Sequence, residues 1–230
     1  MNRLGAAALV LAVGLAAAGL GAEVVALGMG PREQPTPRDE GQGARERALA
    51  LLQGRVSDPD KLRHSYAVED AMRELARETG GDPDHWGLAG LLHDIDLAET
   101  AAGGKPSRHG IVGARLLAEQ GYPPDVVHAV EAHDDAAGVE RTRPIAHALY
   151  CADRAYWAIH SSGLRSPSPE AARATPASVV EELERRGITG RIDADLTREC
   201  ALLGLTLDDV LRVSLDVWQR GLSEEPRVVP

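Results

Sequence analysis

The sequence predicts an all-α domain that follows a separate N-terminal segment. From Ala44 onward, apolar residues recur at the spacings of helix faces, and no convincing stretch alternates apolar and polar residues as a half-buried strand does. Glycines and prolines, such as Gly80-Gly81 and Pro123-Pro124, punctuate these periodic stretches at helix ends and starts. A chain of 230 residues is long enough for one domain of generous size.

The net charge of −10 restricts the class of partner. A general nucleic-acid binder needs a basic surface, which this net charge argues against. Most of the basic residues are arginines, since Lys61 and Lys105 are the only lysines. We therefore expect no nucleic-acid binding surface. Cys151 and Cys200 are far apart in the sequence and form no metal or redox spacing, so they do not indicate an oxidising compartment.

Residues 1–30 form a hydrophobic N-terminal segment. Leu4 to Ala22 carries no charge and has the length of a membrane span. We expect an anchor at residues 4–22, with the following domain cytoplasmic and tethered to the inner face of the membrane, because several arginines follow the segment. One alternative is a true start at Met29, which leaves a soluble cytoplasmic protein. The other is a signal peptide with Ala16-Ala17-Ala18 as its cleavage site.

The rest of the chain divides into a linker and a helical domain. Residues 31–43 are rich in proline and charge, which predicts a linker, and the folded domain is expected to span residues 44–230. Within that domain, the apolar spacing and the stop signals predict helices near 44–54, 59–79, 83–94, 107–120, 124–134, 143–161, 176–187, 194–203 and 207–220.

The helix predicted over 83–94 carries the centre of the candidate site. It is apolar at five successive positions, Leu88 to Leu92, so it is expected to be buried on all sides. It ends in His93 and Asp94, with Asp96 close behind, and such groups are costly to bury unless they are paired or bind a cation. Adjacent residues at a helix end can both reach one ion, so we interpret His93 and Asp94 as metal ligands.

Further metal-ligand types share the apolar faces of four other predicted helices. They are His64, His109, His133 and Asp153. His128 and His147, in contrast, fall opposite the apolar stripes of their helices and are expected to face solvent. Six inward-facing ligands predict one metal centre between helices.

The ordered set His64, His93-Asp94, His109, His133 and Asp153 resembles the HD-domain superfamily of metal-dependent phosphohydrolases. Leu91-Leu92-His93-Asp94-Ile95-Asp96 and Arg108-His109-Gly110 are most similar to the small stand-alone predicted hydrolases of the HDIG type. The HDIG type is named after a His-Asp-Ile-Gly tetrapeptide. In this sequence it reads His93-Asp94-Ile95-Asp96, so Asp96 replaces the glycine. Leu97-Ala98 stands where cyclic-dinucleotide phosphodiesterases have a lysine, so specificity for cyclic dinucleotides is not expected.

The resemblance implies a single HD-domain helical bundle with a C-terminal helical extension, and it implies roles for the ligands. His64, His93, Asp94 and Asp153 would hold a first metal, and His109 and His133 a second, with Asp94 bridging. Nitrogen and carboxylate ligands suit one or two divalent ions of Mn, Fe, Co, Ni or Zn. Asp94 and His93 are the expected catalytic residues.

The expected activity is metal-dependent hydrolysis of a small phosphate ester, with a nucleotide as candidate substrate. Cations next to the ligands in sequence could hold the phosphate; they are Lys105, Arg108 and Arg154. Two alternatives are a non-catalytic module that binds a nucleotide or a partner, and a di-iron oxygenase, since that class also uses six His and Asp ligands.

Overall fold

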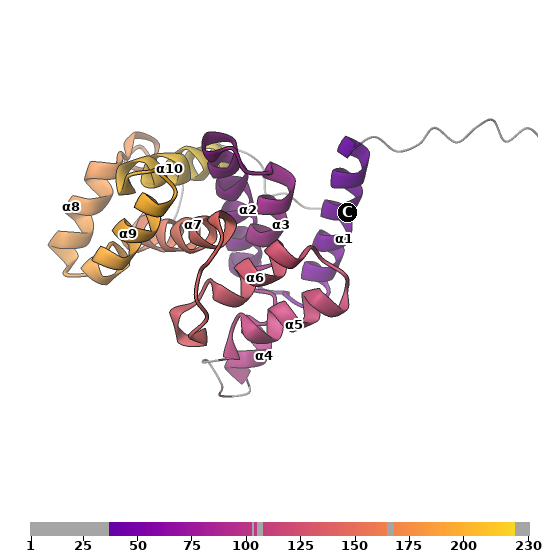
Figure 1. Ribbon diagram of the computed structural model, residues 1–230. Helices are drawn as coiled ribbons and strands as arrows, with labels where there is room; N and C mark the ends of the chain where they lie inside the picture. The colour runs from indigo at the N-terminus through magenta and orange to yellow at the C-terminus, as the bar shows by residue number, and fades with distance from the viewer. Residues whose placement is uncertain (1–36, 103, 105–107, 165–167, 224–230) are drawn as a thin grey trace, which may run out of the picture. The chain divides into compact units, whose positions relative to one another are not determined.

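A computed structural model describes residues 37–102, 104, 108–164 and 168–223. These residues form helices, turns and loops without any strand, which confirms the predicted all-α class (Figure 1). No helix within these ranges is long and apolar enough to cross a membrane. The candidate anchor at residues 4–22 lies outside the described residues. The anchor, its two alternatives and the division into segment, linker and domain therefore stay predictions.

Ten α-helices are described. They are α1 (Pro37–Gln53), α2 (Pro59–Thr79), α3 (Pro83–Leu92), α4 (Leu97–Ala102), α5 (Ile111–Glu119), α6 (Pro124–Ala132), α7 (Pro144–Ser161), α8 (Pro176–Arg186), α9 (Ala194–Leu202) and α10 (Leu207–Ser223). Three short 3-10 turns lie at Asp135–Ala137, Ala171–Arg173 and Thr189–Arg191.

The α2–α3 pair is defined by strong start and stop signals. Asp58 and Asp82 cap the two helices, since each carboxylate accepts a hydrogen bond from a backbone N–H in the first turn. Each is followed by a proline at the first helical position. Gly80 ends α2 in the left-handed conformation, with φ of 79°. These local signals explain why the sequence predicted both helix starts correctly.

Two helix starts differ from the prediction by several residues, and one short helix was not predicted. Helix α1 begins at Pro37 rather than at 44, because a proline that looks like part of a linker also fits the first turn of a helix. Helix α5 begins at Ile111 rather than at 107, because Gly110 before it has φ of 79°, which no α-helix contains. Helix α4 was not predicted, since six residues are too few to show helical periodicity.

Helix α7 is the centre of the packing. It contacts α2, α3, α6, α8, α9 and α10, and small residues, including Ala148, Ala152 and Ala155, are buried along it. In Figure 1, α8, α9 and α10 gather on one side of α7, while α4, α5 and α6 lie on another. Helices from both halves of the domain therefore meet on α7.

Helix α3 lies directly against α2, and a glycine makes this approach possible. A Cβ atom on Gly90 would come within 2.7 Å of the Val68 carbonyl oxygen on α2. Leu91 and Leu92, the residues that follow Gly90, are completely buried. The close contact brings the end of α3, and hence His93, next to α2.

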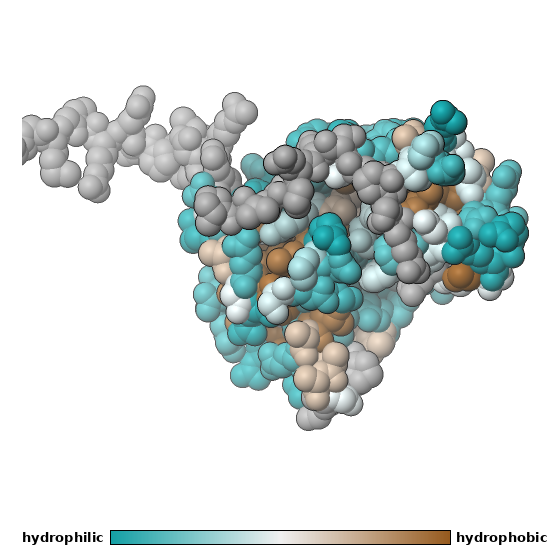
Figure 2. Space-filling view, turned by 180° about the vertical axis from the view of Figure 1, so that it is seen from behind, coloured by the Kyte–Doolittle hydropathy of each residue, from teal (hydrophilic) through white to brown (hydrophobic). Residues whose placement is uncertain are grey.

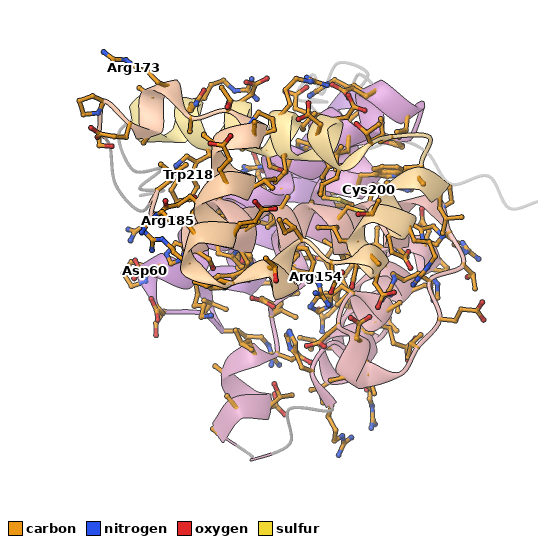
Figure 3. The ribbon with its side chains drawn as sticks, turned by 90° about the vertical axis from the view of Figure 1, so that its left-hand side faces the viewer. Asp60, Arg154, Arg173, Arg185, Cys200 and Trp218 are labelled. Atoms are coloured by element: carbon orange, nitrogen blue, oxygen red, sulfur yellow. The ribbon has the colours of Figure 1, made fainter. Side chains whose placement is uncertain are left out.

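The two cysteines lie together although the sequence separates them. Cys151 on α7 and Cys200 on α9 are both fully buried, with Sγ atoms 3.3 Å apart and both thiols free. Figure 3 shows Cys200 within the helical layers rather than at the surface. The sequence does not predict this proximity, since the two cysteines are 49 residues apart; it arises because α9 folds back over α7.

The surface is mainly polar. In Figure 2, hydrophilic residues cover most of the visible face, and apolar areas are interspersed among them. Among the large hydrophobic side chains of the described residues, Ile188 and Leu202 are the ones classed as exposed.

Candidate metal centre

The six predicted ligand residues come together at one place in the fold. His64 projects from α2, His93 and Asp94 directly follow α3, and His133 directly follows α6. Asp153 comes from the middle of α7. His109 lies on the turn before α5, so the prediction that it lies on the apolar face of a helix was wrong; Gly110 interrupts the helix. Five of these side chains are buried, and that of Asp153 is 21% exposed.

Two groups of three potential ligands share Asp94. In the first, the Nε2 atoms of His64 and His93 are 2.9 Å apart, and both face the Asp94 carboxylate at 3.5 Å. Asp153 joins this group, because its Oδ1 atom is 3.1 Å from His64 Nε2.

The second group is built on the other side of Asp94. His109 Nε2 lies 3.0 Å from Asp94 Oδ1, and His133 Nε2 lies 3.7 Å from the same oxygen. The two Nε2 atoms are 3.1 Å apart. Asp94 therefore stands between the two groups.

The outer ring nitrogens of three histidines are held by hydrogen bonds. His93 Nδ1–H donates to the Gly90 carbonyl at 2.8 Å, and His133 Nδ1–H donates to the Val130 carbonyl at 2.7 Å. A carbonyl can only accept, so the proton is on Nδ1 in both rings. His109 Nδ1 lies 2.7 Å from Asp96 Oδ1. Metal-ligating histidines typically have this arrangement, with Nε2 left for the ion.

The donor set fits divalent cations. Neighbouring imidazole nitrogens and carboxylate oxygens lie 2.9–3.7 Å apart, in a buried site where a carboxylate such as Asp94 needs a compensating positive charge. His64 Nδ1 has no hydrogen-bond partner in the described part of the chain, and the His64 ring contacts that of Tyr156. Four imidazoles and two carboxylates are enough to ligate one or two ions.

Without a bound ion, a proton on His109 would compensate the negative charge of Asp94 and Asp96. Burial lowers the pKa of His109, but its hydrogen bonds to Asp94 and Asp96 raise it to about 10. Burial lowers the pKa of His93 to about 4, so His93 stays neutral. Burial alone would raise the pKa of Asp94, but the surrounding histidines hold it well below its usual range. A metal ion would replace the protons on the histidines.

Asp96 supports the site and was not predicted to do so. Its carboxylate accepts hydrogen bonds from His109 Nδ1–H and from the Gly113 backbone N–H, both at 2.7 Å. It therefore fixes the His109 ring against the start of α5. The sequence offered one signal, a second carboxylate two residues after Asp94 at an apolar helix end, where it needs a partner to be buried. That its partner would be His109 was not predicted.

The two histidines expected to face solvent behave differently from each other. His128 is half-buried and bonds Thr142 near the surface. His147 is covered by α9, and its Nδ1 lies 2.5 Å from Glu199 Oε2. The prediction for His147 was wrong, because periodicity within α7 shows its most buried face but not the helix that covers the opposite one.

The predicted phosphate-binding cations have different surroundings. Lys105 lies outside the described residues. Arg108 is exposed and directly precedes His109. Arg154 contacts Asp135 Oδ2 at 2.6 Å and Asp193 Oδ2 at 3.4 Å, which compensates its charge. The phosphate-binding role of all three stays a prediction.

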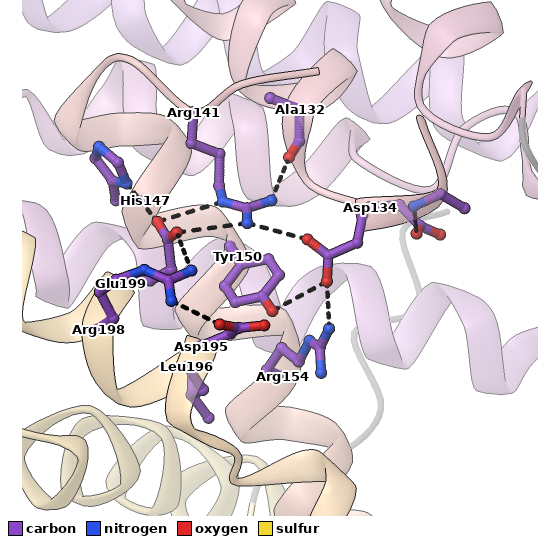
Figure 4. A network of polar contacts seen from close by, with 12 residues as sticks. Ala132, Asp134, Arg141, His147, Tyr150, Arg154, Asp195, Leu196, Arg198 and Glu199 are labelled. Carbon is purple, nitrogen blue, oxygen red and sulfur yellow. Dashed lines mark hydrogen bonds and ion pairs between the residues drawn. The ribbon is translucent and has the colours of Figure 1, made fainter. Parts of the chain in front are cut away.

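Arg154 belongs to a polar network on the outer side of α7 (Figure 4). Arg141, Tyr150 and Arg154 converge on the carboxylate of Asp135, which follows His133 by two residues. Arg141 also pairs with Glu199 of α9. The network thus connects α9 and α7 to the segment that carries His133.

Comparison with known proteins places this geometry in a family. Residues 62–157 match the family model of the HD domain, a range that includes all six candidate ligands. The chain is similar to Ribonuclease Y of Lawsonia intracellularis, with 37% identity over 97 residues, 42% of this chain and 18% of that protein. It is also similar to Ribonuclease Y 2 of Bdellovibrio bacteriovorus, with 31% identity over 155 residues, 61% of this chain and 26% of that protein.

A third similar protein is Ribonuclease Y of Oleidesulfovibrio alaskensis, with 36% identity over 88 residues, 38% of this chain and 17% of that protein. The chain therefore spans only about a quarter or less of the length of these relatives. The matched family model, the helical fold and the buried His and Asp cluster agree with one another. Residues 62–157 of this chain therefore match an HD domain in sequence, in helical fold and in the clustered His and Asp ligands.

Proposed function

We propose that this protein is a divalent-metal-dependent phosphohydrolase that cleaves a phosphate ester of a small molecule, with a nucleotide as the substrate class. The observation that carries the proposal is the pair of ligand groups that share Asp94. Phosphoryl transfer requires positive charge at the transferred group and a positioned nucleophile more than it requires covalent catalysis. A buried set of imidazoles and carboxylates around one or two ions meets both needs.

Each side chain of the site has a distinct task in this proposal. When bound, a divalent ion supplies a Lewis acid and a water of lowered pKa. His64, His93, Asp94 and Asp153 would hold one ion, and Asp94, His109 and His133 the other. Asp153 is the most exposed of the six, so substrate is expected to approach from its side. The exposed guanidinium of Arg108 could then attract a phosphate.

The similar proteins favour a hydrolase and suggest that the bond it cleaves is a phosphodiester. The three relatives carry the name Ribonuclease Y, which denotes cleavage of RNA. The net charge of −10 disfavours binding a long RNA, because the phosphate backbone requires a basic surface. We therefore propose a mononucleotide or a short oligonucleotide as substrate, with ribonuclease activity on longer RNA as the second candidate.

The test combines metal analysis with a substrate panel on the full-length protein. The purified chain is analysed for metals, stripped with a chelator and reloaded with Mn, Fe, Co, Ni or Zn separately. Phosphomonoesters, phosphodiesters, nucleotides and single-stranded RNA are then offered to each form. We expect hydrolysis that the chelator abolishes and at least one transition metal restores.

Two outcomes would overturn the proposal. Tight binding of a phosphorylated ligand without turnover in any metal form would identify a non-catalytic binding module. Oxygen consumption by the iron-loaded protein, without phosphate release, would identify a di-iron oxygenase, whose ligands are also His and carboxylate.

A further inference from the structure

A group of aromatic rings lies directly beside the metal centre. Its members are Tyr156, Trp157 and His160 of α7 and Trp218 of α10, all partly exposed, and we call them the aromatic surface. The ring centroids of Tyr156 and Trp157 lie 4.4 Å and 5.3 Å from that of His64. The chain has no phenylalanine, three tryptophans and four tyrosines, so this is a marked concentration of its aromatic residues.

The helix geometry places this surface on the same side as the ligands. Tyr156, Trp157 and His160 follow Asp153 by three, four and seven residues, so they share its face of α7. Tyr156 contacts Trp218, with centroids 5.5 Å apart, which extends the surface to α10. Figure 3 shows Trp218 on the same side of this view as Asp60, at the start of α2.

Positive charge borders the aromatic surface. Lys61, one turn before His64 on α2, places its Nζ atom 5.4 Å from the centre of the Trp157 ring. Arg63 follows on the same helix and is exposed, in an ion pair with Asp60. A ligand with a planar ring and a phosphate could therefore contact both the aromatic rings and the positive charges.

We propose that the aromatic surface binds the base of a nucleotide by stacking, chiefly on Trp157, while the phosphate of the same molecule lies at the metal centre. The inference rests on the proposed function and names the part of the substrate that provides selectivity. Stacking on an aromatic ring tolerates any base, because every base has a π-face. The surface therefore favours nucleotides over other phosphate esters without choosing one base.

The alternative role of these rings is to orient His64, whose Nδ1 has no hydrogen-bond partner in the described part of the chain. The two roles predict different losses. If Trp157 only positions His64, its removal weakens metal binding and affects every phosphorylated ligand equally. If Trp157 stacks on the base, its removal affects only ligands that carry a base.

The experiment measures binding rather than turnover. The metal-loaded full-length protein is titrated by calorimetry with an adenosine phosphonate, in which a methylene group replaces the ester oxygen, and with the matching ribose phosphonate. The variants are Trp157→Leu, which removes the ring, and Trp157→Phe, which keeps one. Tyr66→Leu is the matched control, since Tyr66 is a partly exposed aromatic residue of α2 outside the aromatic surface. Metal content and circular dichroism are recorded for each.

We expect Trp157→Leu to lower the affinity for the adenosine phosphonate at least tenfold. The affinity for the ribose phosphonate and the metal content should stay unchanged. Trp157→Phe should retain most of the affinity, and tryptophan fluorescence should be quenched by the adenosine compound only. Equal loss for both ligands, loss of metal, or no preference of the wild-type protein for adenosine would overturn the inference. Base-selective binding without hydrolysis in the substrate panel would overturn the proposed function instead.

Discussion

Asp94 links the two halves of the metal centre, since one carboxylate faces both groups of histidines. Asp94→Asn should therefore lose all bound metal and reduce phosphate ester hydrolysis by several orders of magnitude, because positioning of the nucleophile and of the substrate fail together. Elemental analysis and initial rates measure these losses. His128→Ala is the control, because His128 bonds Thr142 away from the site. Retained metal in Asp94→Asn would show that the carboxylate is not a ligand.

The hydrogen bond from His109 to Asp96 should contribute to metal affinity, although Asp96 itself is not a predicted ligand. Asp96→Asn keeps the size of the side chain but weakens the hydrogen bond that fixes the His109 ring. Loss of such a partner typically costs about 10–100-fold in metal affinity. Competition with a chromogenic chelator measures the affinity, with Asp125→Asn as the control. The role of Asp96 would be rejected if both variants bound metal like the wild-type protein.

At the scale of elements, the contact between α2 and α3 should tolerate no added atom. Gly90→Ala places a methyl group against the Val68 carbonyl and the Glu69 backbone, so the helices must separate. Such overpacking costs about 1–3 kcal/mol of the free energy of unfolding. Gly43→Ala in α1 is the control, where the new Cβ meets only Arg47 Nη1 at 3.5 Å. Urea unfolding should show a large loss for the first variant and none for the second.

The contact between α7 and α9 should depend on pH through Glu199. Burial raises the pKa of Glu199, but the hydrogen bonds and charges of His147 and Arg141 lower it by more. The pKa of Glu199 in the folded protein therefore lies below the usual value. Its stabilising contribution is complete above the unfolded pKa of about 4.3 and is lost as the pH falls through the folded pKa.

Glu199→Gln should therefore destabilise the protein at pH 7, by about 1–3 kcal/mol for a broken charged hydrogen bond. The difference from the wild-type protein should shrink as the pH falls below about 4.3. Denaturant unfolding at several pH values measures it, and Glu181→Gln, at an exposed position of α8, serves as control. A difference that stays constant down to pH 3 would contradict the assignment.

The elements show how far sequence patterns reach. The starts of α2, α3 and α6 were predictable because an N-cap or a proline at the first helical position marks them locally. The turn at His109 was not predictable, because it depends on the positive φ of Gly110. Glycine adopts positive and negative φ about equally readily, so the sequence alone does not show which one occurs here. The burial of His147 and the meeting of Cys151 with Cys200 depend on α9, which no pattern within α7 reveals.

For the whole molecule, metal binding and folding should be coupled, because the ligands come from helices that meet only in the folded state. At a free metal concentration 100 times Kd, the gain in stability is about 2.7 kcal/mol. At about 2–4 °C per kcal/mol, the melting temperature of the stripped protein should rise by roughly 5–10 °C on metal addition. Differential scanning calorimetry tests this, and Asp94→Asn should show no rise.

The position of the ligands along the chain has a consequence for the order of folding. The α2–α3 pair contributes three of the six, and His64 is only 29 residues from His93. Asp153 is separated from His64 by about three times as many residues. Each doubling of the length of a loop adds about 0.6 kcal/mol to the free energy of closing it. We therefore expect a refolding chain to form a three-ligand half-site early and to complete it only when α7 docks. In pulse-labelling hydrogen exchange, the amides of α2 and α3 should become protected before those of α7, and an ion present during refolding should first be captured by the half-site.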